Sequence, residues 1–161
     1  MFNRFVKQAR DIAAQAQSIA CGLGSPTVEA EHLLLALSEA QATVAHKALA
    51  EAGLDWHGMR EALAGENERS LAAVGISIAA FDLPPVAGAD ARPQWATSAK
   101  VALERSLTVA AARNDSRIES DHILLGILQA RLGTVPRALE VAGIDRLAFA
   151  RRVEAELDRA G

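Results

Sequence analysis

The chain has 161 residues, of which half are apolar and 4% aromatic, and its formal net charge is −3. Its basic residues are interleaved with acids, which argues against nucleic acid as a partner. Its apolar runs are far shorter than the roughly 20 residues that span a bilayer, and its first ten residues are too charged for a signal peptide. One cysteine, Cys21, cannot form an internal disulfide. We therefore expect a cytoplasmic protein without a membrane partner.

Abundant alanine, absent tyrosine and the lack of sustained alternation predict an all-α fold. The first helix should end near Gly22 and Gly24, where glycine can adopt the left-handed cap. The second, from about residue 29 to 40, is apolar nearly all round and should be the central helix of its unit. A third helix should run from about residue 43 to 53, and Asp55 should cap a fourth. The first helix has an apolar stripe at i, i+3/i+4 spacing: Phe2, Phe5, Ala9, Ile12, Ala16, Ile19 and Leu23.

The second half of the chain is predicted to repeat this order, with helices at 95–113, 119–131, 134–142 and 145–159. In the last helix we expect Leu147, Val153 and Leu157 to face the core. A shift of 90 residues superimposes the two halves without a gap. The identical pairs include Glu29 with Glu119, His32 with His122, Leu34 with Leu124, and Asp55 with Asp145. The sequence thus predicts a pseudo-twofold tandem repeat of two four-helix units, at residues 1–64 and 95–161.

Residues 65–94 form a longer connection between the two units. Its second half is rich in Pro, Gly and Ala and is predicted to be irregular. Its first half contains residues 70–77, which resemble residues 48–55 and 138–145, where a helix ends in glycine followed by Leu or Ile. We therefore expect a third, partial copy of that turn and a short helical segment over 68–82.

Two runs indicate a known family. Residues 29–37 read EAEHLLLAL and residues 119–127 read ESDHILLGI, and the chain opens with MFNRF. These runs resemble the amino-terminal Clp repeat domain of AAA-plus unfoldases of the ClpC and ClpA type. The resemblance implies a pseudo-twofold, eight-helix domain that binds adaptors and substrates above an ATPase ring. No glycine here is followed by lysine, so the P-loop motif is missing. We therefore expect a stand-alone docking domain that is not an enzyme and holds no cofactor.

Glu31 and Asp121 are related by the 90-residue shift and should each lie in the first turn of a central helix. The resemblance implies that they form paired pockets, in which the carboxylate takes the guanidinium of a phosphorylated arginine and the helix N-terminus takes the phosphate. Alternatively, each is an acid that complements the helix dipole. Ala30 departs from the family's threonine, Ser120 keeps a hydroxyl, and Asp121 is one methylene shorter than Glu.

A second candidate site combines Phe2, Trp95, Lys100 and Glu104. In actinobacterial ClpC-like proteins the matching positions line a groove that accepts peptides and macrocyclic antibiotics, so the resemblance implies a peptide-binding groove here. The alternative is that Phe2 and Trp95 simply cover the core.

The histidines do not indicate a metal site. His32 and His122 each follow an acid, and neighbouring helical residues point about 100° apart, so we expect packed, hydrogen-bonded imidazoles that support the helix start. His46 and His57 are predicted to lie at the surface. Cys21 is expected to be a partly exposed, unreactive thiol.

The leading hypothesis is a monomeric protein-binding module that binds Clp unfoldase subunits, adaptors or substrates, including arginine-phosphorylated proteins. It would regulate or feed a Clp unfoldase–protease. The alternative is a sensor or sequestering protein for peptide-like small ligands such as macrocyclic antibiotics. A structural, self-associating helical protein without a Clp connection is a third possibility.

Overall fold

The computed structural model describes residues 5–76 and 92–160, and it is all-α apart from two very short strands. The described helices come in the predicted order, four in each unit. The first unit contains α1 (Lys7–Gly22), α2 (Ala30–Glu39), α3 (Val44–Glu51) and α4 (Trp56–Ala73). The second contains α5 (Thr97–Ala112), α6 (Ser120–Leu128), α7 (Thr134–Val141) and α8 (Arg146–Ala160). The predicted all-α tandem repeat is confirmed.

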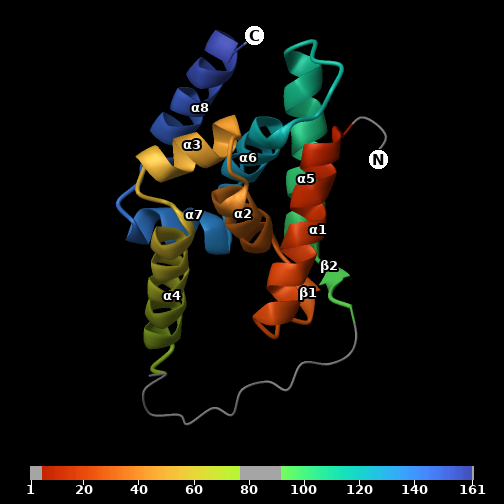
Figure 1. The fold of residues 1–161 in the computed structure, drawn as a ribbon. Helices are drawn as coiled ribbons and strands as arrows, with labels where there is room; N and C mark the ends of the chain where they lie inside the picture. Colours follow the sequence, from red (N-terminus) through yellow and green to blue (C-terminus); the bar gives the residue numbers. More distant parts are fainter. Residues whose placement is uncertain (1–4, 77–91, 161) are drawn as a thin grey trace.

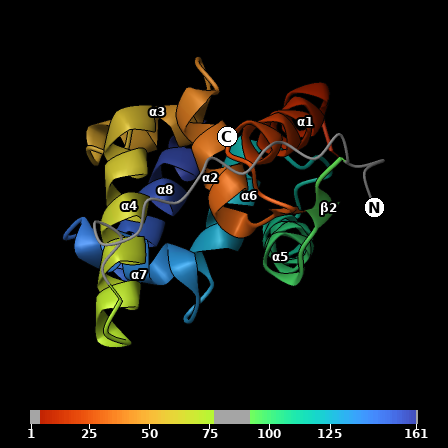
Figure 2. The same cartoon turned by 90° about the horizontal axis from the view of Figure 1, so that it is seen from below.

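The two central helices, α2 and α6, lie in the middle of the molecule, with α1 and α5 on one side and the other four helices on the opposite side (Figures 1 and 2). The units exchange partners on that second side. Helix α4 of the first unit packs on α7 of the second, and α8 of the second packs on α3 of the first. The halves therefore share one interlocked core.

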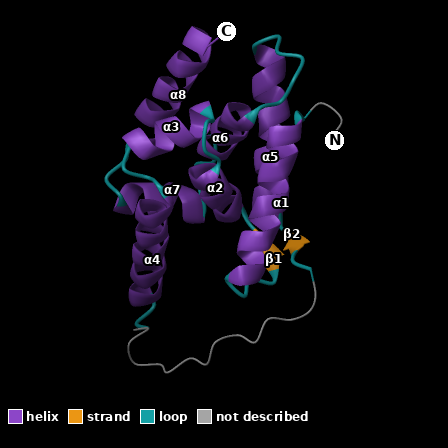
Figure 3. Ribbon diagram, in the orientation of Figure 1, coloured by secondary structure: helices purple, strands orange, loops and turns teal. Residues whose placement is uncertain are grey.

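A second exchange pairs the extended segment before the first helix of each unit with the segment before the second helix of the other unit. Strands β1 (Thr27–Val28) and β2 (Gln94–Trp95) pair in parallel, with Val28 opposite Trp95 (Figure 3). Phe5 forms an isolated parallel bridge with Ile118, which is the same pairing under the 90-residue shift. The predicted helix at 95–113 therefore starts too early. Trp95 is extended because its backbone pairs with the other unit, and α5 begins at Thr97.

The core follows the predicted stripes with two corrections. Residues 33–37 of α2 are all buried, as expected for a central helix. Leu23 is 44% exposed because it lies beyond the last residue of α1, where the helical periodicity no longer applies. Leu147 is 56% exposed, whereas Phe149, Val153 and Leu157 are buried. These three recur every four residues, and a residue two positions before Phe149 points to the opposite face of α8.

Helices α3, α4 and α7 end in the same turn, which also closes α1 at Gly24 and α5 at Asn114. Gly53, Gly75 and Gly143 have φ values of 76°, 80° and 72°, the left-handed region that favours glycine. In each turn the next residue donates to a carbonyl five residues back; the pairs are Leu54 to Leu49, Ile76 to Leu71 and Ile144 to Leu139, at 2.8, 2.9 and 2.9 Å. The segment around Gly75 forms this turn at the end of α4. Helix α4 runs past residue 64 to Ala73, and the rest of the 68–82 segment beyond residue 76 lies outside the described residues.

Candidate functional site

The first turns of the two central helices are held by buried histidines. Nδ1 of His32 accepts a hydrogen bond from the backbone N–H of Glu29 at 2.8 Å, and Nδ1 of His122 accepts one from Glu119 at 3.0 Å. His32 is 5% exposed and His122 is 3% exposed. The predicted packed imidazoles are confirmed, each as part of a capping box. Burial lowers the pKa of His32, with the charge of Glu29 opposing it, which suits a neutral ring that accepts at Nδ1.

One pocket opens beside α2 and has a volume of about 370 Å³. We call it the α2 pocket. It is built from both units, by the start of α2, one face of α5, the end of α6 and the start of α7. The residues that line it are Glu29, Ala30, Glu31, Thr97, Ser98, Val101, Ala102, Arg105, Ile127, Ala130, Leu132, Gly133, Thr134, Val135, Pro136 and Arg137.

The backbone N–H groups at the start of α2 are already occupied. The N–H of Ala30 donates to the hydroxyl of Ser98 on α5 at 3.0 Å, and that hydroxyl donates to the carboxylate of Glu29. The N–H of Glu29 is bound to His32, as described above. Ser98 therefore sits where an anion would meet the N-terminus of α2.

Glu31 lies in the first turn of α2, as predicted. Its side chain is half-buried and lines the α2 pocket. Burial raises the pKa of its carboxyl, and the charges of Glu29 and Glu66 raise it further, whereas its own backbone N–H and Arg137 lower it. Among the described side chains it has no ion-pair partner. An ionised Glu31 is thus an incompletely compensated charge at a pocket surface.

Arg137 of α7 also lines this pocket, and its guanidinium is paired with Glu66 of α4. Its Nε donates to Glu66 at 2.8 Å, and the hydroxyl of Ser70 donates to the same carboxylate oxygen at 2.6 Å. Burial alone would raise the pKa of Glu66, but these hydrogen bonds and the charge of Arg137 outweigh it and lower the pKa. The pair ties the fourth helix of one unit to the third helix of the other.

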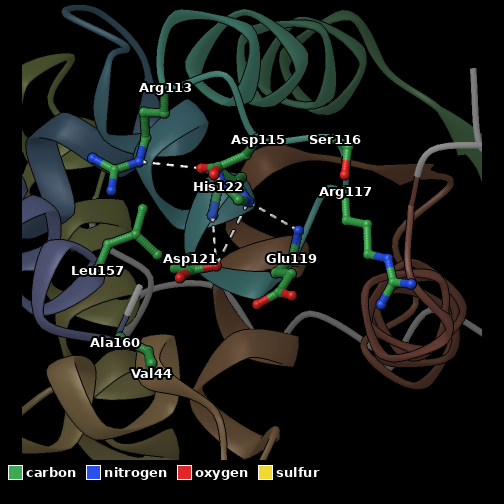
Figure 4. Close-up of a pocket in the computed structure, with 10 residues that line it drawn as sticks. All are labelled: Val44, Arg113, Asp115, Ser116, Arg117, Glu119, Asp121, His122, Leu157 and Ala160. Atoms are coloured by element: carbon green, nitrogen blue, oxygen red, sulfur yellow. Dashed lines mark hydrogen bonds and ion pairs between the residues drawn. The ribbon is translucent and has the colours of Figure 1, made fainter.

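The second pocket opens beside α6, and we call it the α6 pocket. The volume of the α6 pocket is about 310 Å³. It too combines both units, with contributions from α3, α6, α8 and the turn that follows α5 (Figure 4). Its lining residues are Val44, Arg113, Asp115, Ser116, Arg117, Glu119, Asp121, His122, Leu157 and Ala160.

The polar wall of the α6 pocket is an ion-pair network centred on Asp115. Nε2 of His122 donates to Asp115 at 3.0 Å, and Nε of Arg113 donates to the same carboxylate oxygen at 3.3 Å. Arg113 also donates to Asp158 at the end of α8, at 2.7 Å. The hydrogen bond from His122 is the main cause that lowers the pKa of Asp115. The network fixes the start of α6 against the end of α8.

Asp121 is placed differently from Glu31. Its side chain is 3% exposed, and Oδ1 accepts a hydrogen bond from the backbone N–H of His122 at 3.1 Å (Figure 4). Ser120, the first residue of α6, is also buried. Both residues lie in the predicted first turn, but their side chains are packed into the protein.

The groove residues are only partly described. Trp95 is half-buried on β2, and Lys100 and Glu104 are exposed one turn apart on α5. All three lie outside the α2 and α6 pockets. Phe2 lies outside the described residues, so the predicted meeting of Phe2 with Trp95 stays a prediction.

The single cysteine and two further histidines lie away from both pockets. Cys21 and His57 are exposed, as expected. His46 was predicted at the surface but is half-buried, because its Nδ1 donates to the carbonyl oxygen of Ser38 at 2.8 Å. The pocket residues Ser98, Arg105, Arg113 and Asp115 carried no signal in the sequence, because each meets its pocket only through contacts between separate helices.

No described helix is both long and apolar enough to cross a membrane. Within residues 5–76 and 92–160, no three His, Cys, Asp or Glu side chains are grouped so that they could hold a metal ion.

Comparison with known proteins agrees with this architecture. A model of the Clp repeat (R) N-terminal domain matches residues 4–131 and 94–160. The chain is 27% identical over 147 residues to the Bacillus subtilis (strain 168) negative regulator of genetic competence ClpC/MecB, covering 89% of this chain and 16% of that protein. It is 31% identical over 145 residues to the chloroplastic chaperone protein ClpC1 of Oryza sativa subsp. japonica, covering 90% of this chain and 14% of that protein. The chain thus spans a small part of the length of these relatives.

Solved structures show the same fold. The N-terminal domain of the caseinolytic protease associated chaperone ClpD from Arabidopsis thaliana superimposes with a TM-score of 0.67 at 18% identity, covering 98% of this chain and 97% of that one. The N-terminal domain of Hsp104 from Candida albicans gives 0.64 at 18% identity, covering 94% and 89%.

The fold and the paired pockets define an all-α domain of two interlocked helical repeats. The chain belongs to the family of the Clp repeat N-terminal domain.

Proposed function

We propose that the protein is a non-enzymatic protein- and peptide-binding module that regulates or feeds a Clp unfoldase by binding its adaptors or substrates. The observation that supports this most is the pair of open, polar pockets at the starts of the two central helices of a Clp repeat domain. Each pocket combines charged side chains with apolar ones, the composition of a site for an extended segment of a partner.

The pockets also depend on the interlocked fold. The α2 pocket needs Arg137 and Pro136 of α7, and the α6 pocket needs Val44 of α3 and Leu157 of α8. Because both units build each pocket, a partner bound in either one contacts the two halves at once. Binding should therefore be a property of the intact domain.

A pull-down from cell extract, read by mass spectrometry, tests this function. The baits are the intact chain and a Glu31→Ala/Asp121→Ala double variant, and we expect Clp subunits, adaptors or Clp substrates with the intact chain and a loss of several-fold with the variant. A Glu68→Ala/Glu154→Ala variant, which removes two exposed acids away from both pockets, is the matched control and should capture the same partners. Both variants must first show an unchanged helical circular dichroism spectrum. Recovery of no Clp-related protein with the intact chain would contradict the proposed function.

A second candidate, the binding of peptide-like small ligands such as macrocycles, is favoured by the half-buried Trp95 on β2 and the exposed Lys100 and Glu104 on α5, the helix that follows it. We expect titration of a Trp56→Phe variant with a macrocyclic peptide to change the emission of Trp95, since a ligand that covers the indole removes water from it. Emission that stays constant while Trp95 is the only tryptophan present would count against this function. A Lys100→Gln/Glu104→Gln variant checks that any change arises at this face.

A further inference from the structure

A groove lies between α1 and the second half of α2, away from the first turn of that helix, and we call it the α1–α2 groove. Its volume is about 440 Å³, more than that of the α2 pocket or the α6 pocket. Its floor is formed by Ile12, Ala36 and Ala40, of which the first two are buried. Two of these three residues are alanines, whose short side chains leave room for an apolar side chain of a partner.

The groove has a cause in the sequence, because α1 and α2 lie further apart than α5 and α6. Under the 90-residue shift Ala36 corresponds to Gly126, and Ile12 corresponds to Ala102. A Cβ atom at Gly126 would lie 2.4 Å from the carbonyl oxygen of Ala102, so the backbones of α5 and α6 meet too closely for a side chain there. Ala36 has a Cβ atom, and α1 must therefore keep a greater distance from α2 at the matching point.

The rim of the groove is acidic and rich in side-chain amides. Asp11 of α1 and Glu39, the last residue of α2, are both exposed, and Nε2 of Gln15 donates to Glu39 at 3.1 Å from one helix to the other. Gln8 and Gln41 complete the rim, and none of the lining residues is basic. Among the described side chains neither acid forms an ion pair. The negative end of the α2 dipole lies beside them, so the groove favours a cation.

The second unit has the opposite charge at the positions that match this rim. Those that correspond to the two acids and to two of the amides are Val101, Gln129, Arg105 and Arg131. They include two arginines and no acid. A positively charged partner is therefore attracted to the first unit at this surface and repelled by the second.

We propose that the α1–α2 groove docks a basic amphipathic helix of a partner protein. Its apolar side chains contact the floor, and lysines on both sides of them pair with Asp11 and Glu39. A helix fits because the surface between two packed helices can receive a third along its length. Lysine suits exposed acids, since its ammonium stays hydrated while its aliphatic stem covers apolar surface. This inference rests on the proposed function and specifies the chemistry of the partner.

The probe is a labelled peptide of roughly 20 residues, long enough to form a helix. It carries leucines at i, i+4 spacing on one face, lysines on both sides of them and alanine elsewhere, and a second peptide has glutamine in place of every lysine. Fluorescence anisotropy measures binding to the full chain, and isothermal titration calorimetry measures the stoichiometry. We expect one lysine peptide per chain, at least about tenfold weaker binding of the glutamine peptide, and an affinity that falls as salt is added.

Two variants change the rim without touching the floor. Asp11→Asn/Glu39→Gln removes both acids, and Gln15→Arg/Gln41→Arg introduces the arginines of the second unit. Each should weaken the lysine peptide at least about fivefold, because two exposed ion pairs are lost or opposed. All four positions are exposed, so both variants should keep the helical circular dichroism spectrum and the melting temperature of the intact chain.

The control for non-specific attraction is Glu68→Gln/Glu154→Gln. It changes the net charge by the same amount at two exposed positions outside the groove and should leave the affinity nearly unchanged. An equal loss of affinity in this control would overturn the inference, as would equal binding of the glutamine peptide or full affinity in both rim variants. Light scattering provides one more check: self-association that both rim variants abolish would identify a second copy of this chain as the occupant and would also overturn it.

The peptide measurements and the pull-down can fail independently. No measurable binding of the lysine peptide, together with Clp partners captured by the intact chain, would overturn the inference and leave the proposed function standing. Conversely, a single lysine-dependent site that both rim variants weaken, in a chain that captures no Clp partner, would support the docking surface and contradict the proposed function.

Discussion

Replacement of Gly126 by alanine is expected to lower the free energy of unfolding by about 3 kcal/mol, the upper end of the usual cost of overpacking. A Cβ atom at this position of α6 would lie 2.4 Å from the carbonyl oxygen of Ala102 and 2.8 Å from the backbone nitrogen of Ser106, both on α5. These are backbone atoms of a packed helix, so the two helices would have to move apart. The loss is a large share of the roughly 5–15 kcal/mol that stabilises a typical domain.

Urea denaturation of Gly126→Ala, followed by circular dichroism, measures this loss. Gly22→Ala is the control, because a Cβ at the end of α1 meets nothing within 4 Å and should be neutral or stabilising by up to about 1 kcal/mol. A Gly126→Ala protein as stable as the intact chain would mean that α5 and α6 do not cross as closely as the structure shows.

Arg137→Met is expected to destabilise the domain by about 2 kcal/mol, because it leaves the carboxylate of Glu66 buried beside only Ser70. The full cost of breaking a buried pair is discounted here, since the side chain of Arg137 is 54% exposed. The pair joins α4 to α7, so the effect should appear as a loss of overall stability in urea denaturation. A second change, Glu66→Gln, should restore part of the loss by removing the unpaired charge.

Lys47→Met provides the matched control, because Lys47 is the residue equivalent to Arg137 in the first unit. Its pair with Glu51 is exposed, with 66% and 58% of the two side chains accessible, and should contribute less than about 0.5 kcal/mol. The pH dependence gives a further check. The lowered pKa of Glu66 stabilises the fold above the ordinary glutamate pKa of about 4.3, and this contribution is lost as the pH falls through the lower, folded value. The difference between intact and Arg137→Met proteins should therefore shrink on acidification; a constant difference would contradict the pairing.

The partner exchange between the units also affects how the domain can respond to a ligand. The connections of α4 to α7 and of α8 to α3 place the walls of both pockets on helices from both units. A variant that separates the units should consequently lose both pockets together, and stability measurements should accompany every binding measurement on this protein.

The sequence by itself determined the helical class, the tandem duplication and most helix ends. These features depend on the local sequence: apolar spacing marks the buried face of α2, Asp55 caps α4 through the N–H of Gly58 at 2.8 Å, and a glycine closes four separate helices in the same turn. It also placed Glu31 and Asp121 in first turns, and His32 and His122 as supports of those turns.

The tertiary structure decided how these residues are placed relative to the pockets. Ser98 reaches the start of α2 from 68 residues away along the chain, and Glu66 reaches Arg137 from 71 residues away. Neither contact has a local pattern, because each depends on how α4 and α5 pack across the boundary between the units. For the same reason the duplicated sequence predicts two equal carboxylates, whereas packing and one missing methylene bury Asp121 and leave Glu31 at the surface of a pocket.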